Sequence, residues 1–172
     1  MGIRSVLAKP FAAYIASQTK KWSMAPVDFQ QKTFRQLINR AGSTLFGHDH
    51  HFGQIRNHED FKKHVPIRDY EDLKPYIEQI LSGKADVLWP GKPEYFAKTS
   101  GTTSGTKYIP ITSESVPNHI NSARNALLSY VHETGNASFL DAGLIFLSDS
   151  PELDEKAGIK TGRLSGIVNH HV

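Results

Sequence analysis

One segment of the chain gathers the residue types that bind phosphate. Residues 98–107 read KTSGTTSGTK, so two glycines and a series of hydroxyl side chains are followed by a lysine. Glycine lets the backbone turn sharply and present amide N–H groups to phosphate oxygens. Hydroxyls add small donors, and the lysine adds a positive charge. The segment therefore predicts an anion-binding loop, although a polar hairpin loop without a ligand has the same composition.

The spacing of this segment excludes a Walker A loop. That motif has four residues between its glycines and a lysine directly after the second. Here three residues separate Gly101 from Gly105, and Thr106 precedes Lys107. A Walker A loop also leads into a helix, whereas residues 108–111 (YIPI) predict a strand, and Pro110 places that strand at an edge or bulge.

The elements before the loop are predicted to be mainly helical, over residues 1–83. Pro10 predicts a kink or boundary in the first helix, and Pro26 suits the first position of the second. In the first helix the apolar stripe is expected to contain Ile3, Val6, Leu7, Phe11, Tyr14 and Ile15. Apolar residues at helical spacing predict helices over 3–22, 26–41 and 69–81, and a short helical segment over 60–65.

Residues 84–172 predict an α/β arrangement around the loop. Short strands are expected at 95–97 and 108–111, followed by a helix capped by Thr112 or Ser113 and ended by Gly135. Its apolar stripe contains Val116, Ile120, Ala123, Leu127 and Val131. The run LIFL at 144–147 is typical of a strand buried on both faces. Residues 148–172 show no obvious complete element.

Composition and charge limit the function classes. The 172 residues include 20 basic and 17 acidic ones, a net charge of +3 that is too small for a nucleic-acid-binding surface. No apolar stretch approaches the length of a membrane span. The sequence has no cysteine, which excludes disulfides, thiolate zinc sites and a cysteine nucleophile. Without a convincing targeting segment, the chain is expected to be cytoplasmic.

Residues 99–107, with Tyr108-Ile109-Pro110 after them, resemble the phosphate-binding motif of the acyl-adenylate-forming superfamily. Within it they are most similar to the GH3 family of acyl acid–amido synthetases. Segments 69–77 and 161–166 share the likeness, which spans most of residues 26–166. The resemblance implies an α/β fold in which an N-terminal helical layer packs on a partial mixed sheet. Residues 1–172 would then be the front part of a larger adenylate-forming domain.

The resemblance also implies a reaction. GH3-like enzymes use ATP and Mg²⁺ to convert a carboxylic acid to an acyl-adenylate, and then pass the acyl group to an amine such as an amino acid. Lys107 would help to neutralise the ATP phosphates. The β- and γ-phosphates would be surrounded by Thr99, Ser100, Gly101, Thr102, Thr103, Ser104 and Gly105.

The motif departs from the family patterns at three positions. Ser104 stands where the superfamily usually has glycine, and Thr106 replaces a proline. The lysine also comes one residue earlier than in the plant GH3 pattern. These departures bear on the direction of individual amide groups rather than on the loop's predicted role.

Family members are much longer than this chain, so we expect an N-terminal portion that is inactive by itself. It would associate with the remainder of the enzyme or with a second copy, and its partners would be small carboxylic acids and amines, not nucleic acids or membranes. The alternative is a stand-alone phosphate-binding, nucleotide-binding or partner-interaction module without catalysis.

Other candidate residues carry less chemistry. Arg163, in a glycine-flanked run, is a candidate contact for a substrate carboxylate or phosphate. The histidines of the HDHH run at 48–51 lack further ligands at metal-site spacing, so no metal site is predicted. The acidic residues at 152–155 are expected to be solvated. No catalytic acid, base or nucleophile is assigned.

Overall fold

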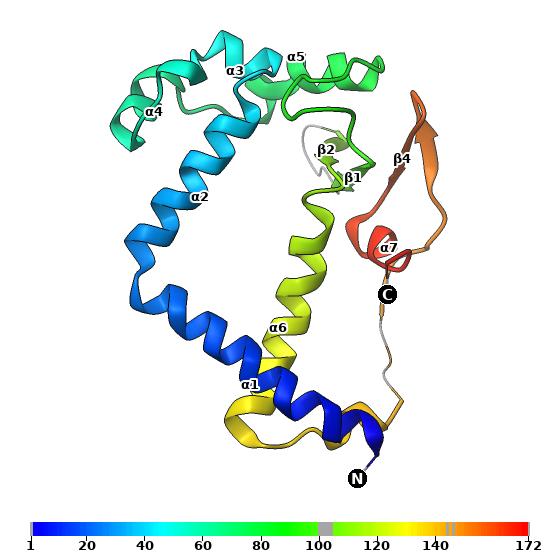
Figure 1. Ribbon diagram of the computed structural model, residues 1–172. Coiled ribbons are helices and arrows are strands. Elements are labelled where there is room, and N and C mark those ends of the chain that lie inside the picture. The colour runs from blue at the N-terminus through cyan, green and yellow to red at the C-terminus, as the bar shows by residue number, and fades with distance from the viewer. Residues whose placement is uncertain (1, 100–104, 144, 146, 172) are drawn as a thin grey trace. The chain divides into compact units, whose positions relative to one another are not determined.

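The computed structural model describes residues 2–99, 105–143, 145 and 147–171 (Figure 1). The chain divides into two compact units, each assembled from two separate stretches. Unit 1 comprises Met1–Phe29 and Glu114–Leu147, and unit 2 comprises Gln30–Ser113 and Ser148–Val172.

Unit 1 is built on two long helices, α1 (Ile3–Met24) and α6 (Val116–Thr134), followed by a short 3₁₀ helix, η2 (Ser138–Asp141). Figure 1 shows α1 crossing α6. Pro117 lies in the first turn of α6, and Gly135 ends the helix with a φ of 68°, as its position in the sequence predicts. The core of the unit consists of Ala12, Ile15, Leu128, Val131 and Ala137.

The buried face of α1 differs from the predicted one. The helix continues through Pro10 without a boundary, and Ser5, Ala12 and Ile15 are its buried residues. Most of the predicted stripe, Ile3, Val6, Leu7, Phe11 and Tyr14, is exposed. Apolar residues lie on several sides of this helix, so periodicity does not select a face. Small side chains such as Ala12 allow α6 to approach closely, and this packing decides which face is buried.

The predicted face of α6 is also only partly correct. Val131 is buried, but Leu128 takes the place of the predicted Leu127, which is half exposed. The helix begins after Ser115 rather than after Thr112 or Ser113. Leu127 and Leu128 are adjacent in the sequence and lie on different sides of the helix. Contact with α1 decides which of the two is buried.

A distant carboxylate caps the start of α1. The N-cap residue is Gly2, which has no side chain to accept hydrogen bonds from the first turn. Asp141 of η2 accepts them instead, from Gly2 N–H at 2.6 Å and from Ser5 N–H at 3.2 Å. Hydrogen bonding to Ser5, and then to the Gly2 backbone, lowers the pKa of the Asp141 carboxyl.

This cap predicts a pH-dependent stability. Because the folded pKa of Asp141 lies below the unfolded value of about 4, its stabilisation is fully present above that pH. It is lost as the pH falls through the lowered value. We expect Asp141→Asn to lower the midpoint of thermal unfolding at neutral pH, measured by circular dichroism. The difference from the wild type should shrink as the solution is acidified, and a difference independent of pH would contradict the cap.

The helical part of unit 2 begins within α2 (Pro26–Ala41), which has Pro26 at its first position as predicted. Three later helices have side-chain caps, in which Thr44, Asn57 and Asp69 each accept a backbone N–H from the first turn. Ile38, Ala41, Phe52 and Ile55 form a core cluster. The elements are α3 (Leu45–Asp49), η1 (Phe52–Gln54), α4 (His58–His64) and α5 (Tyr70–Leu81).

Unit 2 also contains a four-stranded mixed sheet in the order β2-β1-β4-β3. Strand β1 pairs antiparallel with β2 and parallel with β4, and β3 pairs antiparallel with β4. The predicted α/β fold class is confirmed, and β2, which contains Pro110, is an edge strand as expected. The bounds are β1 (Tyr95–Thr99), β2 (Lys107–Ile111), β3 (Asp154–Lys156) and β4 (Ile159–Gly162), followed by helix α7 (Leu164–Val168).

Two predictions for the last third of the chain are wrong. Ile145 and Leu147 are not in a strand and are 87% and 90% exposed, while Leu144 and Phe146 lie outside the described residues. A buried strand needs paired neighbours, and the described part of the chain pairs none with this run. Conversely, the segment expected to lack elements forms β3, β4 and α7. Ala157 and Gly158 have φ values of 51° and 77°, as in the two-residue turns that join tight hairpins.

Candidate phosphate-binding site

Strands β1 and β2 hold the two ends of the predicted phosphate loop. In their antiparallel register Thr99 lies opposite Lys107, so the chain leaves and re-enters the sheet at one position. Gly105 has a φ of 81°, in the left-handed region that glycine adopts without strain. The predicted ligands Ser100, Gly101, Thr102, Thr103 and Ser104 lie outside the described residues.

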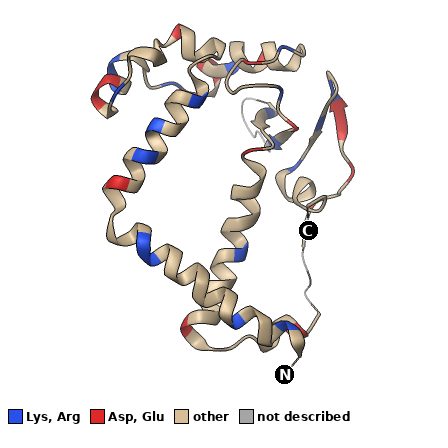
Figure 2. Cartoon of the chain, in the orientation of Figure 1, with Lys and Arg blue, Asp and Glu red and all other residues tan. Residues whose placement is uncertain are grey.

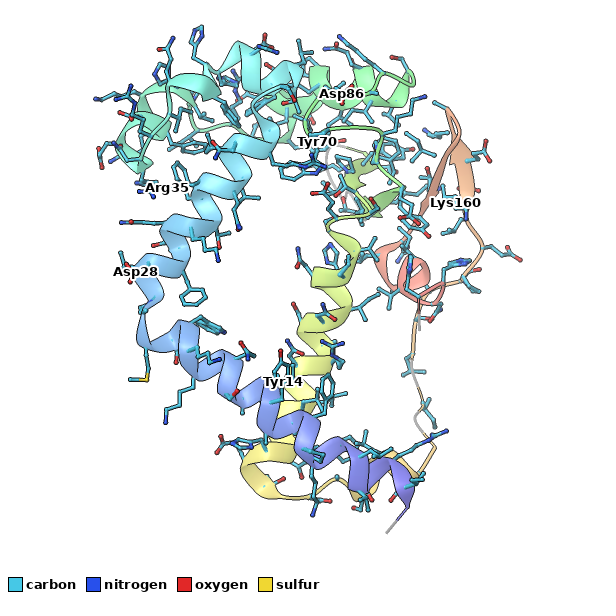
Figure 3. All side chains as sticks on the ribbon, viewed as in Figure 1. Tyr14, Asp28, Arg35, Tyr70, Asp86 and Lys160 are labelled. Carbon is cyan, nitrogen blue, oxygen red and sulfur yellow. The ribbon has the colours of Figure 1, made fainter. Side chains whose placement is uncertain are left out.

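Tyr70, the first residue of α5, contacts the exit of the loop (Figure 3). Its hydroxyl accepts the backbone N–H of Tyr108 at 2.8 Å. The Lys107 Nζ lies 5.2 Å from the centroid of the Tyr70 ring, within the range of a cation–π interaction. Tyr70 therefore holds both the backbone and the cation at the start of β2.

The β3–β4 hairpin contacts the strands on either side of the loop. Lys98, the last residue but one of β1, forms an ion pair with Asp154 of β3. The hydrogen bond from Lys98, and then its charge, lower the pKa of the Asp154 carboxyl. Lys156 donates to the Tyr108 hydroxyl at 2.7 Å and lies 4.3 Å from the centroid of its ring. These contacts tie the loop's two strands to a hairpin about fifty residues away in the sequence.

Arg163 follows β4 directly. Strand β4 runs parallel to β1, with Gly162 opposite Ala97. Arg163 therefore lies beside the carboxyl end of β1, where the loop begins. Its side chain is 61% exposed, and Nη1 lies 3.4 Å from Asp149 Oδ1. The topology thus brings the predicted substrate contact to the loop's edge, where its side chain meets Asp149.

Of the three histidines at 48–51, His50 packs into the fold, whereas His48 and His51 are exposed. His50 is buried and its Nδ1 lies 2.9 Å from the carbonyl oxygen of His64, while its ring lies 4.2 Å from that of Phe46. Among the described residues, no three His, Asp or Glu side chains lie close enough together to hold a metal ion.

The described residues show neither a concentration of one charge (Figure 2) nor a membrane-spanning helix. Figure 2 shows basic and acidic residues interspersed along the elements. None of the helices in the described ranges is both long and apolar enough to cross a bilayer.

The sequence did not predict the contacts of Tyr70 or those of the β3–β4 hairpin. Nothing near Tyr70 in the sequence indicates that its ring faces Lys107, since the two residues come from separate elements. Gly158 lies in the turn of the hairpin that carries Asp154 and Lys156, but Ala-Gly is not among the dipeptides typical of two-residue hairpin loops, so the sequence did not predict this hairpin.

The described geometry suits an anionic ligand. Its described residues include a left-handed glycine, Gly105, with a hydroxyl residue, Thr99, at one end of the loop and a lysine, Lys107, at the other.

Comparison with known proteins gives the same family as the motif. Residues 15–171 match the model of the GH3 family N-terminal domain. An indole-3-acetic acid-amido synthetase of Arabidopsis thaliana is 33% identical over 109 residues, 62% of this chain and 18% of that protein. A jasmonoyl–L-amino acid synthetase of Nicotiana attenuata is 27% identical over 137 residues, 77% of this chain and 23% of that protein.

The fold is shared with a solved GH3.15 acyl acid amido synthetase. The TM-score is 0.76 at 21% identity, over 90% of this chain and 28% of that one. The chain thus spans about a quarter or less of the length of the curated relatives it matches. The match over residues 15–171 shows that this chain belongs to the GH3 family.

Proposed function

We propose that this chain provides the phosphate-binding part of an ATP-dependent acyl acid amido synthetase. Residues 98–107 would hold the β- and γ-phosphates of ATP while a carboxylic acid attacks the α-phosphorus. The observation that carries the proposal is the geometry of the loop ends. Thr99 and Lys107 lie opposite each other, and Gly105 adopts a left-handed conformation between them.

The proposed substrates are a small carboxylic acid and an amino acid. The names of the two curated relatives include indole-3-acetic acid, and a jasmonoyl group with an L-amino acid. Arg163 would contact a substrate carboxylate from the sheet edge that it shares with the loop, after exchanging its contact with Asp149.

In this proposal the chain's own residues act by positioning and by charge stabilisation. Gly105 lets the backbone turn so that amide N–H groups face the phosphates, and Lys107 offsets the negative charge that develops on the leaving pyrophosphate. When bound, Mg²⁺ would neutralise phosphate charge. Among the described residues no three acidic or histidine side chains lie close enough together to hold the ion, so we assign it no ligand from this part of the chain.

Calorimetric titration of residues 1–172 with Mg-ATP and with Mg-pyrophosphate tests this function. We expect weak and comparable affinities, because the phosphate loop would supply most of the contacts and the adenosine would add little. Lys107→Ala should raise both dissociation constants about tenfold or more, since a hydrogen bond to a charged group contributes roughly 1.5–3 kcal/mol. We also expect no acyl-adenylate formation, followed as ATP–pyrophosphate exchange.

Lys63→Ala, which removes the same charge from an exposed position on α4, is the matched control and should leave both affinities unchanged. Failure to bind either ligand would contradict the phosphate-binding function. We expect residues 1–172 to bind the phosphates of ATP without contributing contacts to the adenosine or forming the acyl-adenylate. ATP binding a hundredfold tighter than pyrophosphate, or measurable adenylate formation, would contradict this expectation.

A further inference from the structure

We propose that Tyr70 is a positioning residue for Lys107, holding the lysine ammonium at the exit of the phosphate loop. The inference rests on the function proposed above and adds a residue outside the loop to it. Tyr70 is 38 positions from Tyr108 in the sequence, yet it contacts both Lys107 and Tyr108.

The position of Tyr70 is fixed by the start of α5. Asp69 is the N-cap, and a capping box joins its side chain and backbone to Asp72, which defines the first turn of the helix. Further along the helix, the side chains of Ile77 and Ile80 are buried within unit 2. Tyr70 therefore extends from a rigid element, as a residue that orients another must.

The hydroxyl of Tyr70 fixes the strand. β2 is an edge strand, so some of its backbone N–H groups point away from β1 and need a partner. The N–H of Tyr108 finds one in the Tyr70 Oη at 2.8 Å. This hydrogen bond holds the backbone immediately after Lys107, where the loop rejoins the sheet.

The ring of Tyr70 orients the cation. Lysine is a flexible point charge, and a nearby aromatic face restricts its ammonium without neutralising it. The two lysines that flank the loop differ in this respect. Lys98 pairs with the carboxylate of Asp154, whereas the ion pairs among the described residues do not include Lys107, which has the Tyr70 ring instead. The arrangement leaves the charge of Lys107 for an anionic ligand.

A double-mutant cycle on the full chain tests this role. Mg-pyrophosphate is titrated into the wild type, Tyr70→Leu, Lys107→Ala and the double variant. We expect Tyr70→Leu to raise the dissociation constant about fivefold or more and to add nothing once Lys107 is alanine. Tyr70→Phe keeps the ring and should recover part of the affinity. Tyr130→Leu on α6 of unit 1 is the control and should bind as the wild type does.

A second readout needs no ligand. In the wild type the Tyr70 ring should shift the NMR signals of the Lys107 side-chain methylenes, observed with ¹³C-labelled lysine and assigned through Lys107→Ala. This shift should persist in Tyr70→Phe and disappear in Tyr70→Leu. A general structural role for Tyr70 would not produce that pattern.

The two readouts separate the possible failures. The positioning role is overturned if Tyr70→Leu leaves the affinity of the wild type for pyrophosphate unchanged. It is also overturned if Tyr70→Leu weakens the affinity of the Lys107→Ala variant further. Either result leaves the phosphate-binding function intact. If the wild type binds no pyrophosphate, the proposed function fails. The NMR shift then decides the contact by itself: its loss in Tyr70→Leu supports the contact, and its absence from the wild type overturns it.

Discussion

Replacing Gly105 with valine should raise the dissociation constant for Mg-pyrophosphate at least about tenfold, because the loop would lose one donor or more to the charged phosphate. Gly105 has a φ of 81°, which a β-branched residue adopts only with strain. A Cβ added there meets no atom of the described residues within 4 Å, so the expected effect is that of the backbone conformation. Relief of the strain would turn the neighbouring amide groups away from a bound phosphate. Calorimetric titration measures the effect.

Gly91→Val is a closely matched control for this substitution. Gly91 also belongs to unit 2, has a φ of 80° and is equally open at the Cβ position. Each variant should lose about 1–2 kcal/mol of folding free energy from the left-handed residue. Only Gly105→Val should weaken pyrophosphate binding. Equal loss of affinity in both variants, or normal binding by Gly105→Val, would show that the conformation of Gly105 does not serve the ligand.

Replacing Phe96 with alanine should remove about 3–5 kcal/mol from the free energy of unfolding, as large-to-small core substitutions do. Phe96 lies in β1, has no exposed surface and packs with Ile80, Val87 and Ile159. It therefore joins the sheet to the helices of unit 2, and truncation would leave a cavity beside the strand that leads into the loop. Urea denaturation followed by circular dichroism measures the loss.

The comparison for Phe96→Ala is Phe11→Ala in α1, where the side chain is 42% exposed. Since much of the Phe11 side chain already contacts water, its truncation should cost less than about 1 kcal/mol. Losses of similar size in the two variants would mean that the buried cluster around Phe96 contributes less than its burial indicates.

Features encoded within a few neighbouring residues could be predicted from the sequence. Pro26 and the acidic residues at 69 and 72 mark the starts of α2 and α5, since caps and first turns are local interactions. The glycine and hydroxyl residues of 98–107, between two short apolar runs, predicted the loop between β1 and β2 and the family. These signals depend on spacing along the chain, which the sequence states directly.

The tertiary structure decided which distant residues meet. Asp141 caps Gly2 across 139 positions, Asp154 pairs with Lys98 across 56, and Tyr70 reaches Tyr108 across 38. It also decided which side of α1 is buried, because apolar residues on several sides make the faces alike until α6 packs against one. By itself the sequence predicted the helix and strand segments on either side of the loop. The partners of Lys98 and Lys107, Asp154 and Tyr70, depend on long-range packing that local propensity does not encode.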